Sequence, residues 1–174
     1  MFHENDHFRA FHARYDKGHI ALLSGVLSNG GLNDQLIYES AKKGSLFYLA
    51  IEDTLKGKEL SLPEGVPPFR DKDETYRHEF RVKWWEDFRD STYKDLSIEP
   101  IDGLPEMPVS QSQEWIYGPD ELPVFFGHYW LKGTPGLFRG NICCVDYSVA
   151  KGGVLAAYRY EGERVLQSDK LVWI

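Results

Sequence analysis

The order of the periodic segments is the feature of this sequence that most restricts its fold. Residues 19–56 carry apolar side chains at helical spacing, and the first such run extends from Ile20 to Leu27. The residues after Pro123 instead form short apolar runs typical of strands. A strand-like run at His7–Phe11 precedes the helical region. One strand, then helices, then several strands predicts a mixed α/β or α+β layered domain.

Turn and capping residues divide the helical region into three predicted helices. Residues 28–31 end the first helix, Asn33 or Asp34 caps the second before Gly44 ends it, and Gly57 ends the third. The last third is predicted to form strands separated by turns. These strands are Pro123–Phe126, Ile142–Val145, Val154–Tyr160, Arg164–Leu166 and Leu171–Ile174, and Glu161-Gly162 is the predicted turn of a hairpin between the third and the fourth.

Two stretches without a regular apolar period interrupt these elements. Residues 58–75 and 91–122 are rich in proline, glycine or charge, and they are predicted to be loops. Between them, Phe80, Val82 and Trp84 alternate with cations, which predicts an extended segment.

The composition bounds the domain count and the partners. The chain has 174 residues, 42% of them hydrophobic, and its 20 Lys+Arg against 27 Asp+Glu give a formal net charge of −7. This predicts a single globular domain over residues 1–174 and argues against nucleic acid as a main partner, because such binding uses clustered cations. The adjacent Cys143 and Cys144 are predicted to be buried, reduced thiols. No apolar window is long enough for a membrane span and the first residues lack a signal-peptide pattern, so we expect no membrane partner and a cytoplasmic location.

Two histidines follow predicted strands. His12 comes directly after one strand, and His128 follows another after Gly127. Strand ends deliver side chains to one edge of a sheet, and neutral imidazole is a good ligand for manganese, zinc or iron. The alternative is that each is a hydrogen-bonded turn residue. The remaining histidines have no setting that distinguishes them from surface residues: His3, His7, His19 and His78.

Three further groups are candidates for binding or catalysis. Asp146 ends a predicted buried strand, where it either forms a turn or orients a metal-bound imidazole. Residues 151–153, Lys-Gly-Gly, form either a plain turn or a backbone cradle for phosphate. A third group combines cations with large aromatic faces, which suits either a phosphate-and-ring clamp or ordinary packing. Its members are Arg77, Arg81, Lys83, Trp84 and Trp85.

Four sequence strings resemble one family. PVFFGHYWLKG from Pro123 and NICCVDYSVAKGGVLAAYRYEGE from Asn141 resemble the closing segment of bacterial calcineurin-like metallophosphoesterases, in the branch near serine/threonine protein phosphatases and diadenosine tetraphosphatases. FRAFHARYDKGHIALL from Phe8 resembles the strand of that family that ends in a metal-binding histidine. LKGKELSLPEGVPPFRDKDETYRHEFRVKWW from Leu55 resembles its middle region.

The resemblance implies roles for particular residues. His12 and His128 match metal-ligand histidines, with manganese as the first expectation and iron or zinc as alternatives. Asp146 and Asp16 are expected to support those ligands or the local fold. The expected phosphate or substrate contacts are Arg77, Arg81, Trp84, Trp85 and Tyr129. The implied fold is the C-terminal half of a metallophosphoesterase-type layered β-sandwich flanked by helices.

The family's DxH, GDxxDRG and GNHE elements do not occur in this sequence. They supply the bridging aspartate and further ligands, so the metal centre is expected to be incompletely coordinated by this chain alone. Three explanations of this absence compete. The chain is a split or truncated gene product, a subunit completed by another chain or a second copy, or a domain repurposed for binding.

Three functions remain open at this point. The leading hypothesis is a metal-dependent phosphoester or phosphoanhydride hydrolase, incomplete on its own, acting on a phosphorylated small molecule, nucleotide or phosphoprotein. One alternative is a non-catalytic binding or assembly module with the same half-fold. Another is a sugar- or nucleotide-binding domain that uses Trp84 and Trp85 without a metal.

Overall fold

The chain divides into two compact units. The structure is a computed structural model of residues 1–174, and it describes all of them except residues 28–32, 72–73, 88, 90 and 110–115. Unit 1 comprises Met1–Lys56 and Gly118–Ile174, and unit 2 comprises Gly57–Tyr117. The single domain expected over residues 1–174 stays a prediction, because this division does not decide whether either unit folds alone.

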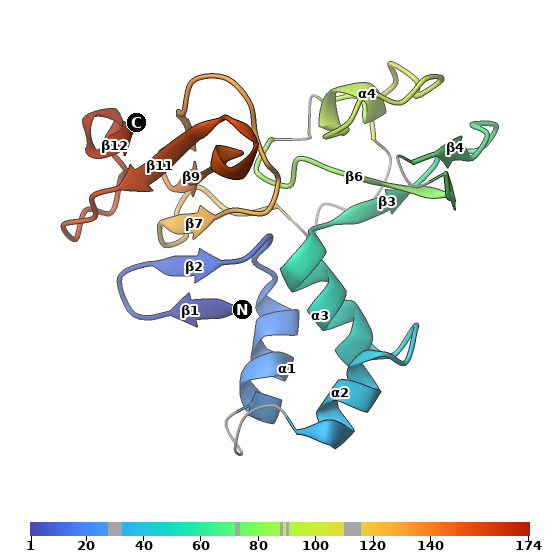
Figure 1. Ribbon diagram of the computed structural model, residues 1–174, viewed down its shortest axis with the longest axis horizontal. Helices are drawn as coiled ribbons and strands as arrows, with labels where there is room; N and C mark the ends of the chain where they lie inside the picture. The colour runs from blue at the N-terminus through green and yellow to red at the C-terminus, as the bar shows by residue number, and fades with distance from the viewer. Residues whose placement is uncertain (28–32, 72–73, 88, 90, 110–115) are drawn as a thin grey trace. The chain divides into compact units, whose positions relative to one another are not determined.

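A five-stranded sheet with the order β1-β2-β7-β9-β8 forms the centre of unit 1 (Figure 1). Its strands are β1 (Phe2–Glu4), β2 (Arg9–Phe11), β7 (Val124–Phe126), β8 (Leu137–Arg139) and β9 (Ile142–Cys144). β2, β7 and β9 are parallel, whereas β1 and β8 run antiparallel to their neighbours. Central parallel strands are covered on both faces, which is why every residue of β9 is apolar and buried.

A second sheet in unit 1 has three antiparallel strands in the order β10-β11-β12. They are β10 (Asp146–Tyr147), β11 (Val154–Tyr158) and β12 (Leu171–Trp173), and the 3₁₀ turns η2 (Val149–Lys151) and η3 (Ser168–Lys170) lie between them. The predicted hairpin with Arg164–Leu166 is wrong, since β11 pairs with β12 instead. Leu166 is buried against Cys143 and Leu171, so its apolar character reflects core packing.

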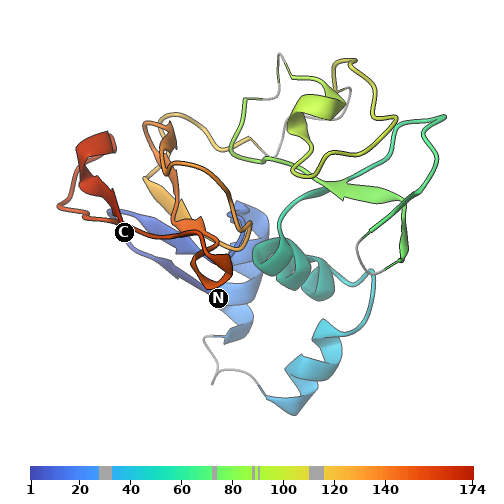
Figure 2. The same cartoon turned by 45° about the horizontal axis from the view of Figure 1, so that its top comes forward.

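The helices of unit 1 are α1 (Lys17–Leu27), α2 (Asp34–Ser40) and α3 (Leu46–Lys56), close to the predicted positions. The side chain of Asn33 caps α2 by accepting a hydrogen bond from the backbone N–H of Leu36. α1 packs against α3 (Figures 1 and 2), burying Ile20, Leu23 and Ala50. The predicted end of the first helix at residues 28–31 lies outside the described residues.

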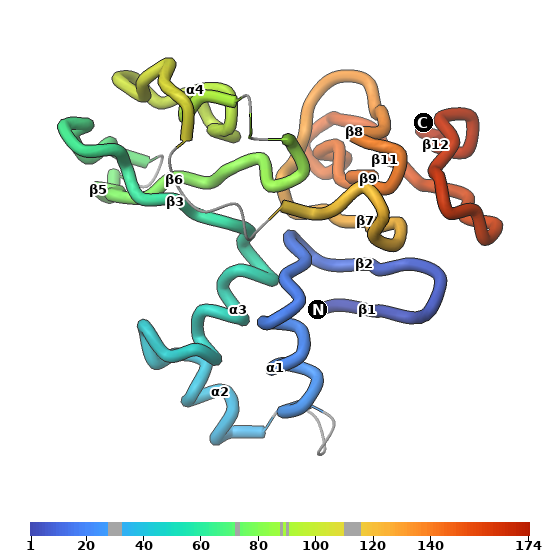
Figure 3. Tube along the Cα trace, turned by 180° about the vertical axis from the view of Figure 1, so that it is seen from behind, coloured from blue at the N-terminus to red at the C-terminus, as the bar shows by residue number. Residues whose placement is uncertain are grey.

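Unit 2 pairs β3 (Glu59–Ser61) with β6 (Glu79–Arg81) and β4 (Phe69–Arg70) with β5 (Tyr76–Arg77), as Figure 3 shows for β3 and β6. A short helix, α4 (Tyr93–Leu96), begins at a reciprocal cap between Thr92 and Asp95. The two loops predicted at 58–75 and 91–122 therefore contain short strands and this helix. The core of the unit consists of Leu60, Phe80, Val82, Tyr93, Leu96 and Leu104.

The described residues thus form a mixed α/β structure with several small sheets. The finer layered sandwich implied by the resemblance stays a prediction. No α-helix formed by the described residues combines the length and the apolar character that crossing a membrane requires.

Candidate functional site

Two histidines meet at one edge of the central sheet. His12 directly follows β2, and His128 follows β7 after Gly127. These strands are parallel neighbours in which Phe11 is the register partner of Phe126, so the residues that follow both strands leave the sheet at the same edge. His12 Nε2 lies 3.1 Å from His128 Nδ1, and the ring centroids are 5.0 Å apart. The topology therefore brings together two residues that are 116 positions apart in the sequence.

The backbone around Gly127 makes this approach feasible. Its N–H donates to the carbonyl oxygen of His12 at 3.0 Å. A Cβ at this position would lie 3.3 Å from the Cβ of Asp146, which is tighter than most such contacts, and 3.8 Å from the carbonyl oxygen of His12, an ordinary van der Waals distance. His128 then adopts a φ of +75°, a conformation uncommon for residues other than glycine. The missing side chain at 127 and the left-handed backbone at 128 together position the second imidazole.

The spacing of the two nitrogens fits a shared metal ion. Imidazole nitrogens bind zinc at about 2.0–2.1 Å, which places neighbouring ligand atoms about 2.8–3.0 Å apart in octahedral geometry and about 3.3–3.4 Å apart in tetrahedral geometry. The 3.1 Å between His12 Nε2 and His128 Nδ1 lies between these two separations. The same distance also suits a direct hydrogen bond between two neutral imidazoles, one acting as donor. The ligand role of both residues stays a prediction.

Asp146 lies beside this edge but makes a turn contact. Its Oδ1 accepts a hydrogen bond from the backbone N–H of Ser148 at 3.2 Å. Its Oδ2 lies 3.9 Å from the place that a Cβ on Gly127 would occupy. The carboxylate therefore sits next to the residue that precedes His128, while one of its oxygens is committed to the turn.

A second polar group surrounds Asp16. Atoms of Asp16, His19 and Asp53 that could ligate a metal all lie within 4.8 Å of one another. His19 Nδ1 lies 2.9 Å from Asp53 Oδ2 and 3.9 Å from Asp16 Oδ1. Arg14 also belongs to this group: it hydrogen-bonds to Asp53 Oδ2, and its Nη2 lies 3.3 Å from Asp16 Oδ2. We call these four residues the Arg14 cluster.

The Arg14 cluster is held together by the chain's own cation. The side chain of Arg14 is only 2% exposed, and it bridges the two carboxylates. Burial alone would raise the pKa of Asp16, but hydrogen bonds from the backbone of His19 and Gly18 and the charge of Arg14 outweigh it and lower that pKa. Those two backbone bonds also begin α1. A metal ion would have to compete with the guanidinium for Asp53, so the cluster is best explained by its role in the fold.

Sequence reasoning included Asp16 but missed its partners. His19 was expected to be an ordinary surface residue, and Arg14 and Asp53 were not singled out. The usable signal was Asp53 itself, which follows Ala50 by three positions on the buried face of α3. A carboxylate on the apolar face of a helix needs a buried partner.

The expected contacts in unit 2 do not form a phosphate clamp. Trp84 and Trp85 are 0% and 2% exposed, and their rings pack edge to face at 6.1 Å. The expectation of a stacking surface there is wrong, because buried rings offer no face to a ligand. Arg77 Nη2 is ion-paired with Asp71 at 2.6 Å, and Arg81 Nε lies 3.6 Å from Glu59.

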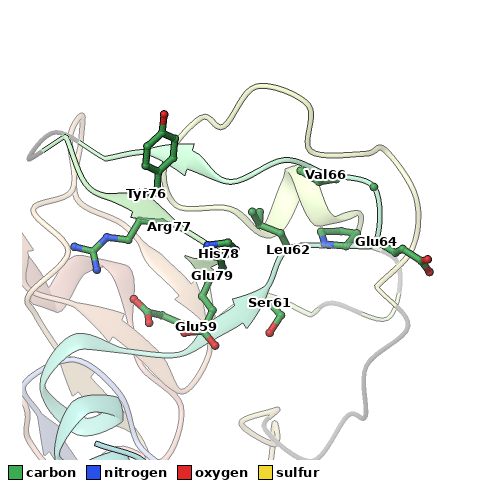
Figure 4. Close-up of a pocket in the computed structure, with 11 residues that line it drawn as sticks. Glu59, Ser61, Leu62, Glu64, Val66, Tyr76, Arg77, His78 and Glu79 are labelled. Atoms are coloured by element: carbon green, nitrogen blue, oxygen red, sulfur yellow. The ribbon is translucent and has the colours of Figure 1, made fainter.

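Unit 2 also contains an open hollow of about 610 Å³, beside which Arg77 lies (Figure 4). Glu59, Glu64 and Glu79 line the same hollow together with His78. Like charges repel, so these acidic groups disfavour a bound phosphate. The geometry therefore gives no support to a phosphate role for Arg77.

Tyr129 is the one expected substrate contact that lies beside the histidine pair. Its ring meets the His128 ring edge to face at 5.5 Å and the Phe126 ring at 5.7 Å. The side chain is half-buried, so it forms part of the wall behind His128.

Comparisons of the chain with protein-family models, with curated proteins and with solved structures found no match.

Proposed function

We propose that this chain supplies His12 and His128 to a divalent-metal centre that hydrolyses phosphoesters or phosphoanhydrides. The supporting observation is the 3.1 Å separation of His12 Nε2 and His128 Nδ1 at the ends of two neighbouring parallel strands. The resemblance to metallophosphoesterases supplies the reaction class. Manganese is the first candidate ion, and iron and zinc also accept imidazole ligands.

The chain's own part in this chemistry is to hold two ligands in place. Each imidazole binds a metal only in its neutral form, so protons compete with the ion as the pH falls. The bound ions would polarise the phosphoryl group and activate the attacking water. Gly127 keeps the His128 backbone against the His12 carbonyl, so the two nitrogens start at a separation close to that of the complex.

The remaining ligands are proposed to come from a second chain, either another copy or a different protein. Two imidazoles leave most positions of a metal ion open. Within the described residues, the one cluster of three such ligands is Asp16, His19 and Asp53, and its Asp53 is already bound by Arg14. A phosphoesterase centre needs bridging carboxylates: the histidine pair has none, and both carboxylates of the Arg14 cluster are paired with Arg14.

Manganese binding by the purified chain tests this proposal. Electron paramagnetic resonance would measure the free ion during titration of the wild type, His12→Ala, His128→Ala and the control His78→Ala, which removes an exposed histidine from unit 2. We expect each site variant to weaken binding by about tenfold or more, because one of two ligands is lost, and the control to bind like the wild type. Equal binding by all four proteins would refute the proposal.

Hydrolysis is measured in the same series. The wild type and His128→Ala are incubated with manganese and a generic aryl phosphate. Hydrolysis that depends on His128 would mean that the chain or its homodimer assembles a working centre. Manganese binding without hydrolysis would direct the search to a partner that supplies the carboxylates.

The second sheet favours one alternative, a non-catalytic assembly module. Leu155 and Ala157 of β11 point to the same face because they are two positions apart, and Val172 of β12 lies opposite Ala157. All three are exposed, Leu155 by 54% and Val172 by 51%. An apolar sheet face of this kind suits contact with another copy. Size-exclusion chromatography with light scattering checks this: Leu155→Glu should convert an oligomer to a monomer without altering manganese binding.

A further inference from the structure

We propose that Trp130 and Lys151 form a platform that binds a phosphate carried on a flat aromatic ring, as in a nucleotide or an aryl phosphate. This inference names the substrate class of the histidine site, and to that extent it rests on the proposed function. The ring would stack on the indole of Trp130, and the phosphate would pair with the ammonium of Lys151.

Trp130 is placed close to the histidine pair and faces solvent. It follows His128 by two positions, so the two Cα atoms lie within about 7 Å of each other. Its side chain is 51% exposed, in contrast to the buried Trp84 and Trp85. A large apolar ring kept half in solvent beside a polar pair is a typical feature of a ligand site.

Lys151 provides a positive charge at this ring. Its Nζ lies 4.0 Å from the centroid of the Trp130 ring. Such a contact is weak when both groups are exposed. The ammonium can therefore turn toward a phosphate at little cost while the indole receives the ring of the ligand.

Hydrogen bonds tie together the two segments that carry this pair. The backbone N–H of Leu131 donates to the carbonyl oxygen of Asp146 at 3.1 Å, and Ser148 Oγ donates to the carbonyl oxygen of Leu131 at 3.1 Å. The N–H of Lys151 donates to the carbonyl oxygen of Ser148 at 2.8 Å. The backbone segments that carry the indole and the ammonium are thus joined to each other before any ligand binds.

The backbone of these segments is also strained. Four residues other than glycine have a positive φ in the described part of the chain, and three of them are His128 at +75°, Trp130 at +50° and Ser148 at +60°. Such conformations persist where the surrounding structure enforces them, and they cluster at ligand sites. Here the strained residues carry one imidazole, the indole and the hydroxyl that joins the two segments.

The two partners together specify the ligand. An indole face gives stacking but carries no charge, whereas an ammonium attracts anions and repels cations. A bare phosphate would use only Lys151, and an uncharged ring would use only Trp130. A ligand that carries both groups gains from both contacts.

The test measures binding to the full chain without metal, by calorimetric titration with AMP, phenyl phosphate and ribose 5-phosphate. We expect the wild type to bind AMP about tenfold more tightly than ribose 5-phosphate, the order of one base–aromatic stack. Trp130→Ala should abolish this preference, and Trp130→Phe should keep part of it. Lys151→Gln should weaken all three ligands. If phenyl phosphate also binds more tightly than ribose 5-phosphate, any flat ring that carries a phosphate is a suitable ligand. If only AMP does so, the ligands of the platform are nucleotides.

The control is Trp173→Ala, which removes another exposed indole from β12 and should keep the AMP preference. A wild type without the preference, or a Trp130→Ala variant that keeps it, would overturn the proposal. His12→Ala separates this inference from the proposed function. If His12→Ala loses manganese binding but keeps the AMP preference, both the metal site and the binding platform are supported. If the wild type shows the AMP preference but binds no manganese, the platform is supported and the metal site is refuted.

Discussion

Replacing Asp53 with alanine is expected to destabilise the protein by about 3–5 kcal/mol, the cost of removing one partner of a buried ion pair. The side chain of Arg14 is 2% exposed and that of Asp53 is 11% exposed, so the guanidinium has little access to solvent that could replace the lost carboxylate. Asp53 Oδ2 also lies 2.9 Å from His19 Nδ1. Of the carboxylates described beside the buried guanidinium, the variant leaves Asp16, whose distance of 3.3 Å makes it the weaker partner.

Urea unfolding followed by far-ultraviolet circular dichroism measures this loss by linear extrapolation. The matched control is Glu52→Ala on the same helix, because Glu52 pairs with Lys56 one turn along the surface and such pairs contribute about 0.3–0.5 kcal/mol. The double variant Arg14→Met with Asp53→Leu removes both charges and should recover most of the stability. If Asp53→Ala costs no more than Glu52→Ala, the ion pair is not the buried support described above.

Two further predictions concern the strands near the histidine pair. Burial raises the pKa of the Cys143 and Cys144 thiols to about 12, so at pH 8 iodoacetamide should label both roughly 10³-fold more slowly in the folded protein than in urea; labelling at equal rates would contradict their burial. Gly153→Ala should destabilise the protein by about 1–3 kcal/mol, because its Cβ would lie 1.9 Å from the carbonyl oxygen of Tyr147. Thermal unfolding measures this against Gly136→Ala, whose Cβ would meet no atom within 4 Å; equal melting temperatures would count against the close approach.

The sequence was most informative where a local pattern decides the structure. The helices follow the apolar period and the capping residues, so α2 begins after Asn33 and α3 ends at Lys56 as predicted. The shared edge of His12 and His128 was also predictable, because each follows a short apolar strand. What periodicity could not supply is that these strands are adjacent and parallel, since strand order depends on contacts between distant segments.

The errors have the same physical origin. Trp84 and Trp85 stand beside cations in the sequence, a pattern shared by exposed clamps and by buried rings. Leu166 follows a turn as a hairpin strand would, yet it fills the core beside Cys143. In each case the partner that decides burial lies far away along the chain. The contact between Trp130 and Lys151 could not be predicted either, because it joins residues that lie in separate local patterns of the sequence.

In the sequence, unit 2 lies between the two segments that form unit 1, and this order has a consequence for biosynthesis. The parallel pairing of β2 with β7 closes a loop that contains the whole of unit 2, and long closures carry an entropic cost and slow folding. While the chain emerges from the ribosome, β2 therefore waits with one open edge until Val124–Phe126 is made. An open edge invites pairing with other chains, so expression at lower temperature or with chaperones should favour the correctly paired product.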